Sequence, residues 1–257
     1  MSKLKFLYPV LLLLLTLSLG CGTNDAAVKP RLVMFVGVDI SGSFMKTREE
    51  DFDDAMEFLS HYLYAHLNGL GGLERPSVLF VSSIGGAKPD EPKTFFPIQT
   101  FDGKTVDEIH DKLTEIFPKD KPNDFTDYNA FFEQVALTVK NKNLVLRPIS
   151  IVMTSDGIPD AKVKGKTDFK SLELKPLERL ARNITVRVLY TDAVVGKNWQ
   201  TQVRRTRVKI WTQDAEVMTS WKDPKIMLPA TPMENQEKFF GWVQDNVDFG
   251  VRARRVD

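Results

Sequence analysis

Cysteine is nearly absent from this sequence, with Cys21 the single one among 257 residues. One cysteine cannot form an intrachain disulfide, so the stability of the protein must come from a hydrophobic core. An excess of charge of one sign is also missing, because 35 Lys and Arg residues stand against 34 Asp and Glu residues. Nucleic-acid binding and anionic-membrane binding therefore have no support from the composition, and we expect no nucleic-acid partner.

Long hydrophobic runs are confined to the first twenty residues. Phe6 to Leu19 is a leucine-rich run of 14 residues behind Lys3 and Lys5. It is shorter than the ~20 residues that a comfortable membrane span needs. A positive start followed by a short apolar core is typical of an export signal, and we interpret residues 1–20 as a bacterial one.

The end of this signal, residues 18–21 (Ser-Leu-Gly-Cys), resembles a lipobox, in which the cysteine becomes the lipidated first residue of the mature protein. Ser18 stands where leucine is usual, and Leu19 stands where a smaller residue is usual. The alternatives are an uncleaved anchor or an ordinary signal cut nearby, with Cys21 free. We expect a lipid on Cys21, with residues 21–30 as a tether that holds the domain at a membrane of the bacterial cell envelope, outside the cytoplasm.

A polar motif follows the first expected strand. Residues 31–38 form an apolar run with the length and β-branched content of a buried parallel strand. Residues 39–43 (Asp-Ile-Ser-Gly-Ser) come next and place a carboxylate and two hydroxyls at every second position, where their oxygens can converge. Such ligands suit Mg²⁺ or Mn²⁺ rather than Zn²⁺. The alternative is a polar turn in which Ser41 or Ser43 caps a helix.

A second apolar run, residues 148–154, also ends in a carboxylate and a glycine, as Ser155-Asp156-Gly157. Residues 124–128 lie between the two motifs, and Thr126 stands at the start of an expected helix. These three features resemble the three loops of the metal-ion-dependent adhesion site of a von Willebrand factor type A (VWA) domain. In order along the chain, they are the motif at 39–43, Thr126 and Asp156-Gly157. The resemblance covers residues 31–250 and leaves residues 251–257 as a basic tail.

The resemblance implies a set of metal ligands for Mg²⁺ or Mn²⁺: Asp39, Ser41, Ser43, Thr126 and Asp156. The two serine hydroxyls would touch the metal directly, the aspartates directly or through water, and the threonine when the site closes on a ligand. Because most of these ligands are neutral, the ion keeps charge and an open position for a carboxylate of a partner protein.

Expected strands and helices alternate along most of the chain. The strands are expected at 31–38, 77–84, 94–98, 148–154, 184–190 and 208–211, and the helices at 47–68, 107–117, 127–139, 172–182, 198–205 and 233–247. This order predicts an α/β fold, a three-layer, doubly wound, mostly parallel sheet with helices on both faces, Rossmann-like as in VWA domains. In the family's strand order the strand before Asp39 lies beside the strand before Asp156, at the edge where such folds bind ligands.

Other polar residues have simpler interpretations. Asp127 and Asp160 are expected to be solvated turn residues. His61, His66 and His110 fall on expected helices and are interpreted as helix-surface or core residues. Residues 204–207 and the tail are interpreted as solvated charge, although the tail could touch anionic lipid or a partner.

The implied function is a membrane-tethered protein-interaction module, and not an enzyme. One alternative is a Mg²⁺-dependent hydrolase or phosphatase that uses Asp39 or Asp156. Against it, the sequence lacks a D-x-D nucleophile loop at residues 39–41, a G-x-S-x-G elbow and an H-E-x-x-H helix. A domain of this fold that binds partners without metal is a third possibility, against which the complete ligand set argues.

Overall fold

Six strands form one sheet in the order β3-β2-β1-β4-β7-β8. The computed structural model describes residues 30–86, 92–123, 125–160, 162–163 and 166–249. The five parallel strands are β1 (Val33–Val38), β2 (Val78–Ser83), β4 (Ile149–Thr154), β7 (Ile184–Thr191) and β8 (Val208–Asp214). The two-residue strand β3 (Phe96–Pro97) pairs antiparallel with β2 at one edge, where proline is tolerated.

The central strands are buried on both faces, as their apolar sequences predict. All six residues of β1 and all six of β4 are buried. The two strands pair in register from Val33 with Ile149 to Val38 with Thr154, so they end at the same level. A parallel sheet with two covered faces accounts for these continuous apolar runs.

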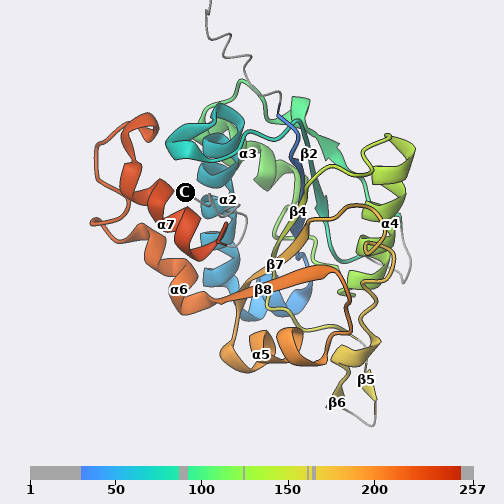
Figure 1. Cartoon of the computed structure of the whole chain (residues 1–257). Helices are drawn as coiled ribbons and strands as arrows, with labels where there is room; N and C mark the ends of the chain where they lie inside the picture. The colour runs from blue at the N-terminus through green and yellow to red at the C-terminus, as the bar shows by residue number, and fades with distance from the viewer. Residues whose placement is uncertain (1–29, 87–91, 124, 161, 164–165, 250–257) are drawn as a thin grey trace, which may run out of the picture.

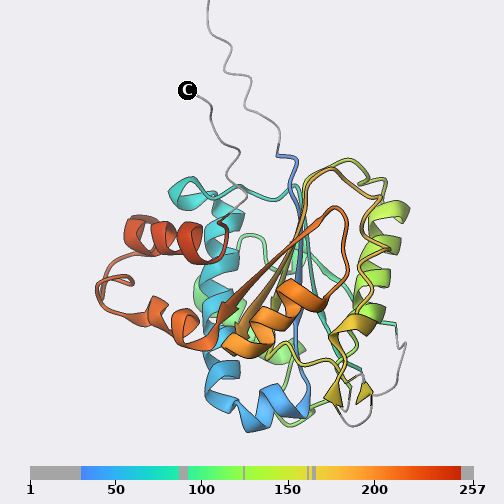
Figure 2. The same ribbon diagram turned by 60° about the horizontal axis from the view of Figure 1, so that its bottom comes forward.

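Helices cover both faces of the sheet (Figures 1 and 2). One core lies under α2 (Glu49–Asn68), α3 (Val106–Ile116), α6 (Ala215–Thr219) and α7 (Glu237–Asn246). The other core lies under α4 (Tyr128–Asn141) and α5 (Ala193–Gln202). The predicted three-layer α/β fold is therefore confirmed.

The helix expected at 172–182 is wrong. This stretch has no helix, and its buried leucines, among them Leu174 and Leu177, reach the second core from a series of turns. Pro176 explains the difference, because it has no N–H to donate and disfavours helical backbone at Lys175.

Smaller differences concern the ends of elements. The helix expected at 198–205 begins earlier, as α5, and the helix expected at 233–247 is divided at Gln236 into a 3₁₀ turn (Met233–Asn235) and α7. A short hairpin of β5 (Lys162–Val163) and β6 (Lys166–Thr167), which pair antiparallel, has no counterpart among the expected strands. No helix in the described part of the chain is long and apolar enough to cross a membrane. The export signal, Cys21 and the basic tail lie outside the described residues.

Candidate metal centre

The candidate centre lies where the strand order reverses. From β1 the chain continues to β2 on one side, and it later returns to β4 on the other side of β1. Asp39 directly follows β1, and its backbone N–H donates to the Thr154 carbonyl at the end of β4, 2.9 Å away. Asp156 lies two residues after Thr154. Both aspartates therefore lie at the crevice where doubly wound sheets bind ligands.

The first loop holds its three oxygen-bearing side chains close together. One carboxylate oxygen of Asp39, Oδ1, accepts a hydrogen bond from the Ser41 N–H at 2.9 Å. The hydroxyl of Ser41 is 3.0 Å from that of Ser43. Asp39 and Ser41 are buried and Ser43 is exposed, so the row of oxygens leads from the interior to the surface. The hydroxyls of Ser41 and Ser43 therefore contact each other, and Asp39 contacts Ser41 through its backbone N–H.

The third loop is connected to the first by side-chain hydrogen bonds. Ser155 Oγ donates to the other oxygen of Asp39, Oδ2, at 2.5 Å. The Ser43 hydroxyl lies near the Asp156 carboxylate and lowers its pKa, and Oδ1 of Asp156 accepts a hydrogen bond from the Ile158 N–H at 2.9 Å. Sequence reasoning missed Ser155, which also accepts from the Tyr128 hydroxyl at 2.6 Å. Only the position of Ser155 directly before Asp156 pointed to it.

The second loop is fixed by backbone contacts. The Asn123 N–H donates to the Ile40 carbonyl at 2.7 Å, so this loop runs beside the first. The Thr126 N–H donates to the Asp160 carboxylate of the third loop. Thr126 is buried, and its hydroxyl makes no hydrogen bond to the other four candidate ligands. Three of the five predicted ligands, Asp39, Ser41 and Ser43, thus form one hydrogen-bonded group. Asp156 lies beside this group, and the Thr126 backbone is bonded to Asp160 of the third loop.

The two other acids of these loops do more than the sequence indicated. Asp127 caps α4 by accepting from the Ala130 N–H at 3.0 Å. Asp160 is exposed, as expected of a turn residue, but its carboxylate holds the Thr126 backbone. Both were expected to be only solvated, and both position the second loop.

Burial makes the two central carboxylates costly to ionise. Desolvation raises the pKa of Asp39 to about 6, and the negative charge of Asp156 acts in the same direction. Hydrogen bonds from Ser155 and Ser41 oppose this shift. Burial also raises the pKa of Asp156, while the hydrogen bonds from Ile158 and Ser43 and the charge of Arg48 lower it. The site therefore has two neighbouring carboxylates, and the positive charge around them is too small to keep their pKa values in the usual range.

This chemistry fits a divalent cation. The positive charge of a cation bound beside the carboxylates would offset the burial and the repulsion from Asp156 that together raise the pKa of Asp39. The donors are oxygens only, which Mg²⁺ and Mn²⁺ prefer. Among the described residues, no group of three or more His, Cys, Asp or Glu side chains could hold a metal ion, so an ion here would depend on the serine and threonine hydroxyls.

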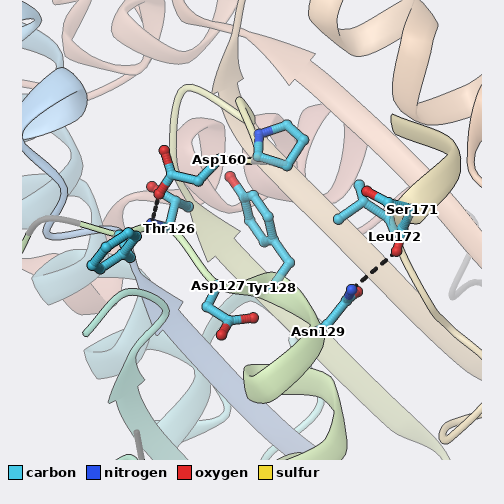
Figure 3. A pocket seen from close by; sticks show the side chains of 9 residues that line it. Thr126, Asp127, Tyr128, Asn129, Asp160, Ser171 and Leu172 are labelled. Atoms are coloured by element: carbon cyan, nitrogen blue, oxygen red, sulfur yellow. Dashed lines mark hydrogen bonds between the residues drawn. The ribbon is translucent and has the colours of Figure 1, made fainter. Parts of the chain in front are cut away.

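A pocket of about 180 Å³ adjoins the second loop (Figure 3). Thr126, Tyr128 and Asp160 line one side of it, and Ser171 and Leu172 line the other. Phe125 and Pro159 also line it, which makes its wall largely apolar. The pocket offers space for a side chain of a molecule bound at the candidate centre.

No protein-family model matches the chain, and no curated protein matches it. Solved structures with a similar fold include proximal thread matrix protein 1 from the mussel byssus, with 14% identity, 75% of this chain and 46% of that chain covered, and a TM-score of 0.49. The pilus adhesin SpaC from Lactobacillus rhamnosus GG has 13% identity, 83% and 31% coverage and a TM-score of 0.45. The vWF domain of the type V pili tip protein Mfa5 from Porphyromonas gingivalis has 14% identity, 52% and 40% coverage and a TM-score of 0.31.

A further structure of the mussel protein has a zinc-occupied MIDAS motif, at 14% identity and a TM-score of 0.44. The chain spans less than half the length of each of these proteins. Similarity at this level is compatible with many ligands and partners. The fold of this chain rests on its own strand order, and the chemistry of its site on its own residues.

Proposed function

We propose that this protein is a VWA-type interaction module whose Asp39, Ser41, Ser43, Thr126 and Asp156 hold Mg²⁺ or Mn²⁺ and bind a partner protein through one of its carboxylates. The protein is a bacterial lipoprotein, anchored through Cys21 to a membrane of the cell envelope with the domain outside the cytoplasm. The observation that carries the metal site is the pair of buried carboxylates, Asp39 and Asp156, at the end of β1 and β4.

The surface around the centre supports a protein partner. Three of the exposed large apolar side chains of the described residues lie at this end of the sheet, Phe125 and Ile158 in two of the loops and Val194 in the first turn of α5, and they are 37%, 40% and 69% exposed. Apolar side chains around a polar centre are common at protein interfaces. A partner carboxylate at the ion would therefore be surrounded by apolar contacts.

Calorimetry tests the metal site. Mn²⁺ should bind the wild type with about one ion per chain and should give no binding heat with Asp39→Ala. Asp102→Ala is the matched control, because Asp102 is an exposed aspartate paired with Arg75, and this variant should bind like the wild type. Equal binding by Asp39→Ala and the wild type would refute the site.

Affinity capture tests the partner. The protein is immobilised and exposed to an envelope extract with Mn²⁺, with EDTA, and with EDTA followed by excess Mn²⁺. A true partner is retained with Mn²⁺, lost with EDTA, recovered on re-addition, and absent from Asp39→Ala. Retention that ignores EDTA shows binding away from the ion and contradicts the proposal.

The histidines favour a binding module over a hydrolase. His66 lies on α2 and contacts the Glu74 carbonyl and Asp248, and the His61 ring packs on Trp221. Neither is placed to act as a general base for the carboxylates of the centre. Generic phosphatase and esterase substrates with Mg²⁺ should therefore show no turnover that Asp39→Ala abolishes.

A further inference from the structure

At the amino-terminal ends of the five parallel strands, opposite the candidate centre, the surface is formed by the segments that lead into these strands. These segments are residues 30–32, 73–77, 142–148, 178–183 and 203–207. Hydrogen bonds join neighbouring segments: the Ser77 N–H donates to the Leu32 carbonyl at 2.8 Å, and the Leu146 N–H donates to the Leu180 carbonyl at 2.8 Å. We call this surface the basic edge. It lies at the top of Figure 2, whereas the turn after β1 lies at the bottom.

Charge along the basic edge is strongly one-sided. Its basic residues are Arg31, Arg75, Lys142, Arg147, Arg179, Arg182, Arg204, Arg205 and Arg207, and its acidic residues are Glu74 and Glu178. Asp102, which lies outside these segments, pairs with Arg75 at 3.5 Å. All of the basic residues except the half-buried Arg147 are exposed. The nearly neutral composition hides this surface, because the acids of the chain are concentrated elsewhere, including at the candidate centre.

The middle of the basic edge carries exposed apolar side chains. Leu146 is 72% exposed and Val145 is 41% exposed, in the segment before the central strand β4. Leu146 also has a φ of 70°, a left-handed conformation that is strained for a residue with a β-carbon. An exposed leucine held in this conformation contributes nothing to the core. Its position among arginines and lysines is that of a side chain that enters a lipid surface.

The tether enters the domain at the same edge. Residue 30 lies three positions before Val33, the first residue of β1. Nine peptide steps separate residue 30 from Cys21, and they extend at most about 30 Å. With a lipid on Cys21, as proposed above, the basic edge faces the membrane and the candidate centre faces away from it.

We propose that the basic edge docks on an anionic phospholipid surface, with Arg and Lys side chains at the headgroups and Leu146 inserted between them. The exposed Leu146 and the nearby tether favour a membrane over a nucleic acid, for which basic charge alone would suffice. Docking fixes the orientation of the domain, so that the centre is presented to partners beyond the membrane surface.

Vesicle co-sedimentation tests this proposal on a chain without the lipid anchor. Both cores are formed by residues between Leu32 and Val247, so a chain of residues 22–257 keeps every core residue. In 0.1 M salt it should bind vesicles with about one third phosphatidylglycerol, should release them in 0.5 M salt, and should not bind pure phosphatidylcholine. Charge reversal in Arg204→Glu/Arg207→Glu should lower the vesicle partition coefficient at least about tenfold.

The matched control is Lys225→Glu/Lys238→Glu, which changes net charge equally at exposed residues away from the basic edge. It should keep most of the binding. Leu146→Gly should raise the melting temperature, because it removes the left-handed strain, and should still lower vesicle binding. A purely structural Leu146 predicts no loss of vesicle binding, so this opposite change in the two measurements identifies a membrane contact.

Three outcomes overturn the proposal. They are absence of binding to the anionic vesicles, equal loss in the two charge-reversal variants, and equally tight binding to a 20-base-pair DNA duplex in the same salt. Vesicle binding should persist in EDTA and in Asp39→Ala. Failure of the metal site is therefore distinguished from failure of the basic edge.

Discussion

At the scale of single residues, the candidate centre depends on side chains that orient Asp39 as well as on the candidate ligands. The predicted motif at residues 39–43 and Asp156 could be found from the sequence, because each follows an apolar strand. Ser155 could not, because its contact with Asp39 joins residues 116 positions apart. Its own neighbours in the sequence give no sign that its hydroxyl points at a carboxylate.

Replacing Ser155 should weaken metal binding without removing it. Ser155→Ala deletes the donor to Asp39 Oδ2 and the acceptor of the Tyr128 hydroxyl. Loss of a group that orients a metal ligand typically costs about 10- to 100-fold in metal affinity. Calorimetry with Mn²⁺ should show this decrease, and Ser60→Ala, at another buried serine on α2, should leave the affinity unchanged. Unchanged affinity in Ser155→Ala would show that Ser155 only fills space.

Metal binding should also depend on pH through Asp39. In the metal-free protein the pKa of this carboxyl is raised to about 6 from 3.8. Mn²⁺ must displace its proton, so the affinity should fall by up to about tenfold per pH unit below pH 6 and level off above it. Calorimetry between pH 5 and 7.5 measures this slope and the proton released.

The same pKa predicts the sign of a stability change. Because the native carboxyl binds a proton more tightly than the unfolded one, Asp39 stabilises the metal-free protein below pH 3.8, and this contribution is lost as the pH rises through 6. Mn²⁺ should therefore raise the melting temperature more at pH 7.5 than at pH 5. A thermal shift that is equal at both pH values would contradict this account.

At the scale of elements, strong local sequence patterns were sufficient to predict the strands and the long helices. Features that depend on long-range contacts could not be predicted from them. The strands and the long helices follow from apolar periodicity, and β1 and β4 lie side by side as the resemblance implied. The false helix at 172–182 has helical leucine spacing, but Pro176 and burial under α4 determine its path. The anchoring of α7 could not be predicted either, since His66 and Tyr62 of α2 meet Asp248 from more than 180 positions away.

Replacement by alanine should destabilise the protein at one glycine of the centre and leave it almost unchanged at another. Gly157 has a φ of 77°, and a β-carbon there would lie 2.9 Å from Thr191 Cγ2 and from Val195 Cγ1. Gly42 has a φ of −61°, and a β-carbon there would meet nothing within 4 Å. Gly157→Ala should therefore cost at least roughly 1–3 kcal/mol and weaken Mn²⁺ binding by displacing Asp156.

Gly42→Ala serves as the control and should change stability by less than about 0.5 kcal/mol. Urea unfolding and Mn²⁺ calorimetry measure both variants. Equal stability of Gly157→Ala and the wild type would mean that α5 moves aside easily and that the third loop is not held by its packing.

At the scale of the whole molecule, the parallel topology places the candidate centre and the basic edge at opposite ends of the strands, whereas the composition gives only the summed charge. The loops after the strands carry the candidate centre, and the segments before the strands carry the exposed arginines of the basic edge. The near-neutral net charge of +1 gave no support for an anionic-membrane contact. Only the strand order shows that Arg31, Arg147 and Arg204, which are far apart in the sequence, share one edge.

The lipid proposed on Cys21 would determine which end of the sheet faces the membrane in the cell. Growth with radiolabelled palmitate should label the wild type and leave Cys21→Ser unlabelled at equal protein levels, because the chain has no second cysteine. Mass spectrometry should find a mature chain that begins at residue 21. Protein present without label would remove the anchor, and the basic edge would then have to hold the domain by charge and Leu146 alone. Such binding weakens steeply with salt. The labelled wild type should therefore stay on the membrane in high salt, whereas the 22–257 chain should be extracted. This pair of results would show that the lipid provides attachment and the basic edge provides orientation.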